Sequence, residues 1–140
     1  MTTQHDPARD ILDAYTAAVA ERDVEAFMAL YDEDCHRFDT WDQFEQTGSA
    51  GWREIVTDWF GSHPDDVFET RFDDVHVSVG DTVAFLRATM TFSVVEHGTP
   101  AHRQVNRYTA CLERKNGVWK IVHEHSSMPI SYESRDHVPS

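Results

Sequence analysis

The hydrophobic residues of this chain change their spacing near Val67, and this change restricts the possible folds more than any other feature of the sequence. Before Val67, apolar side chains recur at the spacing of one face of a helix, and after it they alternate, as on one face of a strand. The pairs Gly80-Asp81, His97-Gly98 and Asn116-Gly117 interrupt the alternating part and are typical of tight turns. We therefore predict four long strands, over about 67–79, 82–96, 101–114 and 118–128.

The part before Val67 contains three predicted helices. Asp6-Pro7 is typical of a helix start, and Asp23 is expected to cap a second, shorter helix. Ser49 is expected to cap a third helix, which ends at Gly61. This third helix carries a clear apolar stripe, made of Trp52, Ile55, Val56, Trp59 and Phe60. Between the second and third helices we expect a short strand over 35–39 and a loop over 40–48.

Helices followed by a run of long strands predict an α+β fold class, in which three N-terminal helices pack on one face of a curved, mainly antiparallel sheet. The sequence has no internal repeat and no low-complexity linker. We therefore expect a single domain over residues 1–140, with a core at about 8–130. The polar tail over 131–140 is expected to fray or to cross a neighbouring subunit.

The composition excludes several classes of partner. The formal net charge is −13, which argues against binding to nucleic acid or to an anionic membrane, because both need a basic surface. Two cysteines form neither a disulfide framework nor a complete zinc site. The N-terminus has no signal-peptide pattern, so a cytoplasmic location is expected. Aromatic residues make up 11% of the chain, which favours a bulky core or an aromatic cavity.

The predicted strand over 82–96 is substantially apolar on both faces. Val83 and Phe85 lie on one face, and Ala84 and Leu86 lie on the other. Helices cover only one face in this arrangement, so the other needs a different cover. A homodimer formed through the sheet is the simplest cover, and a long buried C-terminal segment is the alternative.

Three stretches resemble the SnoaL-like branch of the nuclear-transport-factor-2-like superfamily. They are A-E-R-D-V-E-A-F-M-A-L-Y-D-E-D, the later G-W-R-E-I, and the ending R-Y-T-A-C-L-E-R-K-N-G-V-W-K-I-V-H-E-H-S-S-M-P. The ending also resembles the association domain of calcium/calmodulin-dependent kinase II. The resemblance covers about residues 8–130 and implies a cone, in which a strongly bent sheet wraps around the helices and a pocket lies at the open end. Because the family includes cyclases, isomerases, dehydratases and non-catalytic assembly domains, usually dimeric, it does not fix the activity.

The resemblance to the kinase association domain places few of that domain's pocket residues in this chain. Arg87 matches one of its arginines, whereas Ala110 and Ser126 stand where two others would be. Phe27 replaces a pocket tyrosine, and Trp52 replaces a histidine. The resemblance therefore implies an apolar or neutral ligand rather than an anion.

The ending contains three consecutive ionisable residues, His123, Glu124 and His125. Strand alternation puts the two histidines on one face and Glu124 on the other. A two-residue turn at Asn116-Gly117 would place Ala110 opposite His123, and a three-residue loop would instead place Thr109 opposite His123 and Tyr108 opposite Glu124. The resemblance favours the second register, in which the concave side carries Asn106, Tyr108, Ala110, Val122, Glu124 and Ser126.

Glu124 is the candidate general base of the predicted pocket, with Tyr108 beside it. The chemistry that fits is abstraction of a proton next to a carbonyl, with Tyr108, Asn106 or Arg87 stabilising the enolate. The alternative is an ion pair between Glu124 and Arg87 that only neutralises two buried charges. A metal site is disfavoured, because two histidines on one face lack further converging donors.

Asp39 is expected at the rim of the predicted pocket. The residues expected to line the pocket are aromatic or polar: Tyr15, Phe27, Phe38, Trp41, Trp52, Asn106 and Ser126. Tyr15 is either a pocket residue or a core residue, and the loop with Trp41 is either a lid or ordinary packing. We expect a small molecule as ligand and no cofactor. The predicted function is a cofactor-independent isomerase, cyclase or dehydratase that acts on an apolar, carbonyl-bearing metabolite by general acid/base catalysis. The alternative is a non-catalytic ligand-binding or assembly domain.

Overall fold

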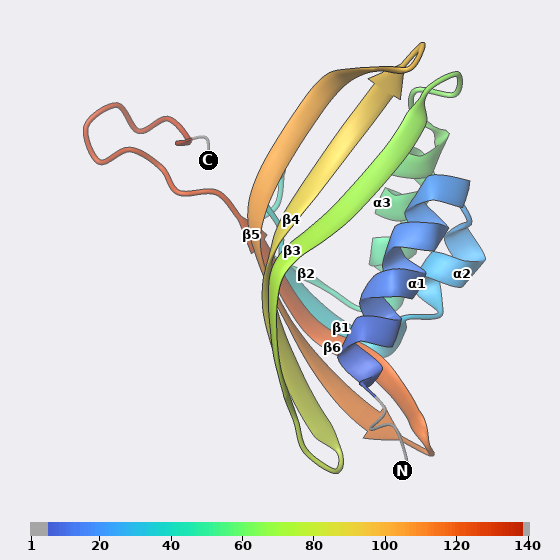
Figure 1. Ribbon diagram of the computed structural model, residues 1–140. Coiled ribbons are helices and arrows are strands. Elements are labelled where there is room, and N and C mark those ends of the chain that lie inside the picture. Colours follow the sequence, from blue (N-terminus) through green and yellow to red (C-terminus); the bar gives the residue numbers. More distant parts are fainter. Residues whose placement is uncertain (1–5, 139–140) are drawn as a thin grey trace.

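The computed structural model describes residues 6–138 and consists of a strongly bent sheet with helices on its concave side (Figure 1). The helices are α1 (Pro7–Glu21), α2 (Val24–Met28) and α3 (Ser49–Gly61). The strands are β1 (Tyr31–Phe38), β2 (Gln46–Thr47), β3 (Val67–Val79), β4 (Val83–Glu96), β5 (Thr99–Lys115) and β6 (Val118–Ser127). The predicted α+β fold class with three N-terminal helices is confirmed.

The sheet has the order β2-β1-β6-β5-β4-β3. Strands β3 to β6 form an antiparallel meander, as the turn pairs predict. The exception is β1, which runs parallel to β6, so that Arg37 pairs with Glu124. This parallel pairing brings together residues that are far apart in the sequence, and it places β1 beside the candidate base.

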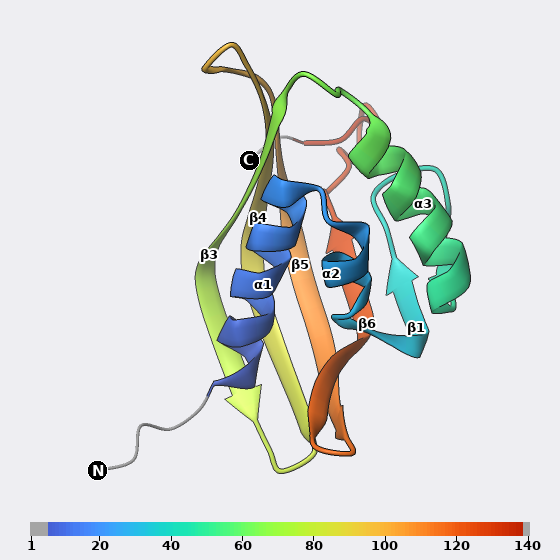
Figure 2. The ribbon, with the colours of Figure 1, turned by 90° about the vertical axis from the view of Figure 1, so that its right-hand side faces the viewer.

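The helices cover the concave face of the sheet (Figure 2). Helix α1 packs against β3, and α3 packs against β1 and β2. The sequence determines the first helix as expected, because the Asp6 side chain accepts hydrogen bonds from the amides of Ala8 and Arg9. Its buried stripe then faces the sheet and includes Ile11, Leu12, Tyr15, Ala18 and Val19.

The start of α3 differs from the prediction. Gly48 occupies the N-cap position instead of Ser49, which is the first helical residue, and no side-chain cap is found for this helix among the described residues. Gly48 has a φ of 91°, a conformation in which a side chain would be strained. Its amide donates to the Cys35 carbonyl over 2.8 Å, so the start of α3 is tied to β1.

The last hairpin follows neither predicted register along its whole length. Asn116 and Gly117 form a two-residue turn with positive φ angles, and Lys115 pairs with Val118. A bulge at Val122 then shifts the pairing, so that Ala110 lies opposite Glu124. The bulge produces the same faces as the second predicted register, with Glu124 inside and both histidines outside, except that Ile121 rather than Val122 points inward.

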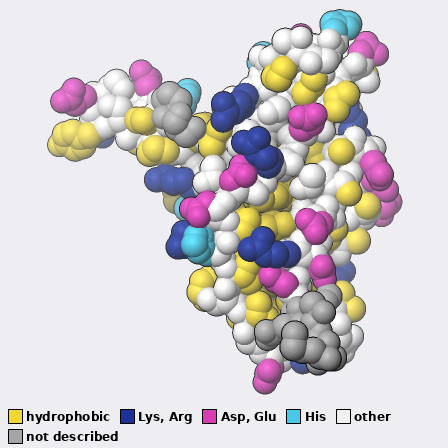
Figure 3. Space-filling model, in the orientation of Figure 1, with side chains coloured by type: hydrophobic (Ala, Val, Ile, Leu, Met, Phe, Trp, Pro, Cys, Tyr) yellow, Lys and Arg dark blue, Asp and Glu magenta, His cyan; other side chains and the backbone are white. Residues whose placement is uncertain are grey.

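The outer face of the sheet carries exposed apolar side chains. Phe85 is 52% exposed and Val83 is 55% exposed, so neither is covered by the residues that the structure describes. The C-terminal segment does not cover them either, because it folds back on itself through the bridge between Ile130 and His137 and projects from the sheet (Figures 1 and 3). Tyr132 lies exposed on this projecting segment.

No helix among residues 6–138 is long and apolar enough to cross a membrane.

Candidate functional site

A cavity of about 400 Å³ lies between α3, the middle of α1 and the concave face of the sheet. Its walls combine aromatic, aliphatic and acidic side chains from nearly every element. The predicted residues that line it are Tyr15, Trp41, Trp52, Asn106, Tyr108, Glu124 and Ser126. This size suits a small ligand rather than a macromolecule.

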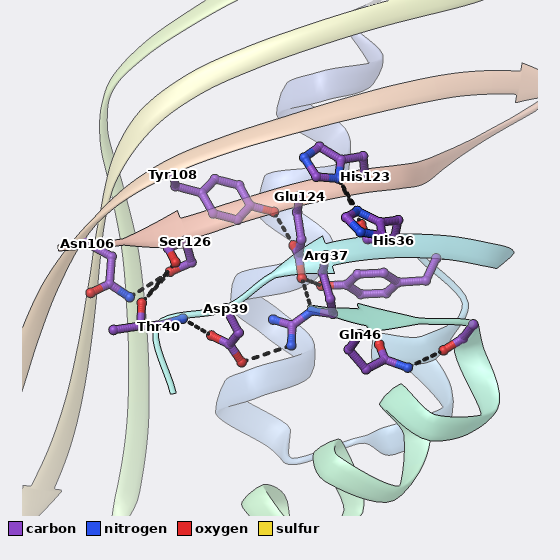
Figure 4. Close-up of polar contacts among 12 residues, drawn as sticks. His36, Arg37, Asp39, Thr40, Gln46, Asn106, Tyr108, His123, Glu124 and Ser126 are labelled. Carbon is purple, nitrogen blue, oxygen red and sulfur yellow. Dashed lines mark hydrogen bonds and ion pairs between the residues drawn. The ribbon is translucent and has the colours of Figure 1, made fainter. Parts of the chain in front are cut away.

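Glu124 is the most enclosed acidic group of the site, with 1% of its surface exposed. Its Oε1 accepts hydrogen bonds from the Tyr31 hydroxyl (2.8 Å) and from Arg37 Nε (3.0 Å), and its Oε2 accepts from the Tyr108 hydroxyl (2.7 Å; Figure 4). Burial and then the charge of Glu124 hold the pKa values of both tyrosines well above their usual range, so both remain donors. Glu124 is therefore held on both oxygens by fixed donors.

Arg37 is the cation of the site, and the sequence reasoning missed it. It lies between Glu124 and Asp39 (Figure 4). Its guanidinium carbon lies 3.4 Å from the centroid of the Trp52 ring. Burial alone would lower the pKa of Arg37, but Glu124 and then Tyr31 and Asp39 raise it on balance. The local signal was the alternation Cys35, Arg37, Asp39, which puts Cys35 and Arg37 on the inner face of β1 and Asp39, just after the strand, on the cavity side.

Asp39 is the second carboxylate bound to Arg37, and it remains open to the cavity. Its Oδ2 accepts from Arg37 Nη1 over 2.9 Å, and its Oδ1 accepts from the Thr40 amide over 2.7 Å. Its side chain is 23% exposed, in contrast to the enclosed Glu124. Asp39 is therefore the more accessible carboxylate for a bound ligand, whereas both oxygens of Glu124 already accept hydrogen bonds.

Tyr15 reaches the cavity from α1. Its ring packs against Phe27, Phe72 and Tyr108, and burial followed by the charge of Glu124 raises the pKa of its hydroxyl. Among residues 6–138, no hydrogen bond of this hydroxyl is found. It is thus a neutral donor that faces the cavity, next to a group of carboxylates.

A chain of neutral hydrogen bonds forms another wall of the cavity. Asn106 Nδ2 donates to Ser126 Oγ over 2.7 Å, and Gln104 Nε2 donates to Asn106 Oδ1 over 2.7 Å. Thr40 Oγ1 donates to the Ser126 carbonyl over 3.0 Å. These contacts fix the orientation of Asn106 and Ser126, both of which were predicted to line the pocket.

Three predicted site residues lie elsewhere. Arg87 is exposed on the outer face, because the alternation of β4 turns Leu86 and Ala88 inward. Phe38 lies on the outer face as well, against His36, His123 and His125. Phe27 is fully buried in the core behind Tyr15 and Trp52, away from the cavity wall.

The two histidines of the ending belong to an outer cluster. His123 Nδ1 lies 3.0 Å from His36 Nδ1, and the two rings stack. Burial and then the neighbouring His36 lower the pKa of His123. Within residues 6–138, the grouping of metal-type donors is a different one, His63, Asp66 and Glu96, whose ligand atoms lie within 4.8 Å of one another outside the cavity.

Comparisons with solved structures identify the fold. An NTF2-like protein of unknown function from Pseudomonas putida KT2440 aligns with a TM-score of 0.85 and 19% identity, over 95% of this chain and 92% of that chain. A candidate calcium/calmodulin-dependent protein kinase II association domain from Xanthomonas campestris aligns with a TM-score of 0.71 and 21% identity, over 90% of this chain and 88% of that chain. A candidate dehydratase of the NTF2-like family from Streptomyces avermitilis aligns with a TM-score of 0.73 and 17% identity, over 89% of this chain and 95% of that chain.

The sequence itself matches a family. A search of curated proteins found no match. The profile of the SnoaL-like domain, however, matches residues 8–131, which is nearly the whole extent of the helices and the sheet. Together with the shared fold, this match shows that the chain belongs to the SnoaL-like branch of the nuclear-transport-factor-2-like superfamily.

Proposed function

We propose that this protein is a cofactor-independent isomerase, cyclase or dehydratase that acts on an apolar, carbonyl-bearing small molecule. The observation that carries the proposal is a carboxylate, Asp39, that faces an aromatic cavity and is fixed by Arg37 and the Thr40 amide. A fixed carboxylate beside a ligand is the group needed to remove a proton from carbon next to a carbonyl.

In the proposed reaction, Asp39 is the base instead of Glu124. Asp39 takes the proton from the carbon next to the carbonyl, the C–H electron pair forms the enolate double bond, and the carbonyl oxygen becomes an oxyanion. The Tyr15 hydroxyl donates a hydrogen bond to that oxyanion. Where the substrate is an unsaturated ketone, the enolate is a dienolate, and return of the proton from Asp39 to its far carbon completes an isomerisation. Where the substrate carries a hydroxyl group on the next carbon, the C–O bond breaks as the carbonyl re-forms, and the leaving hydroxide takes the proton from Asp39 and departs as water, which completes a dehydration.

Glu124 has a supporting role in this proposal. Tyr31 and Tyr108 hold Glu124 in place, and Glu124 fixes the guanidinium of Arg37. Arg37 in turn fixes Asp39. Trp41 is 57% exposed at the mouth of the cavity, and we propose that its loop closes over the ligand. Closure would exclude water and strengthen the interactions of the oxyanion.

Exchange of the α-hydrogens of α-tetralone in D₂O, followed by NMR, tests the proposed chemistry. The unaltered protein is expected to accelerate exchange, and Asp39→Asn to reduce that acceleration by about a hundredfold or more. Asp81→Asn, in the exposed turn between β3 and β4, is the matched control. Equal acceleration by Asp39→Asn and the unaltered protein would remove Asp39 from the proposed reaction.

The complete engagement of Glu124 supports a second candidate, a ligand-binding domain without catalysis. A carboxylate held by an arginine and two tyrosines is also what a rigid binding cavity needs. Saturable binding of α-tetralone without any accelerated exchange would favour this candidate over the enzyme.

We also propose that two copies of the chain associate through the outer face of the sheet. The exposed Phe85 and Val83 support this proposal, since an apolar outer face is stabilised by a cover. Light scattering tests it, and a monomer at micromolar concentration would contradict it. Phe85→Glu is expected to shift the association toward the monomer.

A further inference from the structure

Three buried polar atoms of this protein lack a hydrogen-bond partner among residues 6–138, and all three belong to residues that line the same cavity. They are Trp52 Nε1, Gln46 Oε1 and Thr70 Oγ1. A buried polar atom without a partner is rare in folded proteins, because its lost hydration is not replaced. Three such atoms around one cavity indicate that a ligand supplies the missing partners.

The orientation of the Gln46 amide is fixed by its neighbours. Its Nε2 donates to the carbonyls of Thr47 (3.0 Å) and Gly48 (2.7 Å), so a flipped amide would set its oxygen against two carbonyl oxygens. Gly51 leaves the room for this amide, since a Cβ at that position would lie 2.9 Å from Gln46 Nε2. Gln46 Oε1 is therefore an acceptor that needs a donor.

Trp52 is a rigid donor at the same end of the cavity. Its ring is 3% exposed and packs between Arg37 and the rings of Phe27 and Tyr31. Gln46 lies opposite Arg37 in the pairing of β1 with β2, so both unpartnered groups adjoin the same arginine. An indole N–H only donates and an amide oxygen only accepts, so the two complement a hydroxyl group, which does both.

Thr70 lies across the sheet from this pair. It belongs to β3, the opposite edge strand from β2, which carries Gln46. Its side chain is 6% exposed, and aliphatic and aromatic side chains complete the walls: Ile55, Trp59, Met90 and Phe92. This part of the wall is thus largely apolar, and unpartnered polar groups come from both edges of the sheet.

We propose that the ligand is a neutral, largely apolar compound with two separate oxygen functions. A hydroxyl group accepts from Trp52 Nε1 and donates to Gln46 Oε1, and a second oxygen, the carbonyl where the proposed function holds, accepts from Thr70 Oγ1. A carboxylate does not suit either function, because the acidic residues that line the cavity, Asp39, Asp42, Glu45 and Glu124, outnumber its lining cation, Arg37. The inference rests on the proposed function only for naming that second oxygen as a carbonyl.

Three probe compounds separate the two subsites. The first is 6-hydroxy-α-tetralone, which has both functions. The second is α-tetralone, which lacks the hydroxyl group, and the third is the phenol 5,6,7,8-tetrahydro-2-naphthol (the tetrahydronaphthol), which lacks the carbonyl group. Binding is measured by isothermal titration calorimetry in mildly acidic buffer, where the phenol is neutral. The unaltered protein is expected to bind the hydroxytetralone about five to ten times more tightly than the tetrahydronaphthol, which lacks one hydrogen bond, and about ten times or more so than α-tetralone, which lacks both hydrogen bonds of the hydroxyl group.

Substitutions assign each function to its subsite. Trp52→Phe is expected to lower the affinity for the hydroxytetralone and for the tetrahydronaphthol about fivefold and to leave the affinity for α-tetralone unchanged. Thr70→Val is expected to lower the affinity for the two ketones about fivefold and to leave the affinity for the tetrahydronaphthol unchanged. The controls are Trp119→Phe and Thr109→Val. Trp119 lies beside Arg114 outside the cavity, and Thr109 is exposed on the outer face.

A measurement without ligand provides a second test. Thr70→Val removes an unpartnered buried hydroxyl, so it is expected to raise the melting temperature, and Thr109→Val is expected to leave it unchanged. The proposal is overturned if the losses of affinity do not sort by functional group, if the hydroxytetralone does not bind saturably up to millimolar concentration, or if Thr70→Val lowers the melting temperature. Failure of hydrogen exchange with the binding pattern intact would overturn the proposed reaction alone.

Discussion

The two faces of β6 differ sharply although their residues alternate along one strand. Glu124 on the inner face is enclosed by Tyr31, Tyr108 and Arg37, whereas His123 on the outer face stacks on His36 near solvent. The two inner tyrosines remain protonated donors, since burial and then the charge of Glu124 raise their pKa values. The difference teaches that the ionisable groups most conspicuous in the sequence, the two histidines, lie on the face without the cavity.

Arg37→Met should produce the largest change, because it leaves two carboxylates, Glu124 and Asp39, without their shared cation. The expected loss of unfolding free energy is about 3–5 kcal/mol, measured by urea denaturation. Arg107→Met, on the exposed outer face of β5, is the control and should cost less than about 1 kcal/mol. Similar losses for both variants would show that the inner ion pairs are no more important than surface charges.

Tyr108→Phe tests a single donor of the inner cluster. It removes one hydrogen bond to the buried Glu124 carboxylate, which should cost about 1.5–3 kcal/mol of unfolding free energy. Tyr132→Phe alters an exposed tyrosine of the projecting C-terminal segment and should have no measurable effect in the same denaturation experiment. An unchanged unfolding free energy in Tyr108→Phe would mean that the Tyr108 hydroxyl does not stabilise the buried Glu124 carboxylate.

His123 should give the smallest effect, visible as a pH dependence. Its folded-state pKa lies below its usual value of about 6.5, so the unfolded chain binds the proton more readily. Unfolding free energy should therefore fall as the pH drops through that usual value and level off below the folded pKa. His123→Gln should flatten this dependence, and His97→Gln in the exposed turn after β4 should not. An unchanged pH dependence in His123→Gln would place the titrating group elsewhere.

The sequence pattern predicted the helices, the long strands and the inward direction of Glu124, because all of these follow from local periodicity and turn residues. It did not predict Arg37 as the cation that forms an ion pair with Glu124. Arg37 reaches Glu124 only through the parallel pairing of β1 with β6, which no local pattern encodes. Arg87 was named from a resemblance, but its own alternation within β4 directs it outward.

The bulge at Val122 was likewise beyond the local pattern. Both predicted registers assumed a regular ladder, and the bulge shifts the pairing by one residue in the middle of β6. The unpartnered atoms of Gln46 and Thr70 were also missed, since a polar residue near a strand edge looks like an ordinary surface residue until the fold encloses it.

The indole N–H signals of the four tryptophans offer the most direct test of the claim that the inner face holds the ligand. In a ¹H–¹⁵N NMR titration with 6-hydroxy-α-tetralone, the Trp52 signal should shift saturably and most, because its N–H binds the hydroxyl group. The signals of Trp41 and Trp59 should shift less, because these residues line the cavity without that hydrogen bond. The Trp119 signal, outside the cavity, should stay in place. A saturable shift of Trp119 with an unmoved Trp52 would contradict the account.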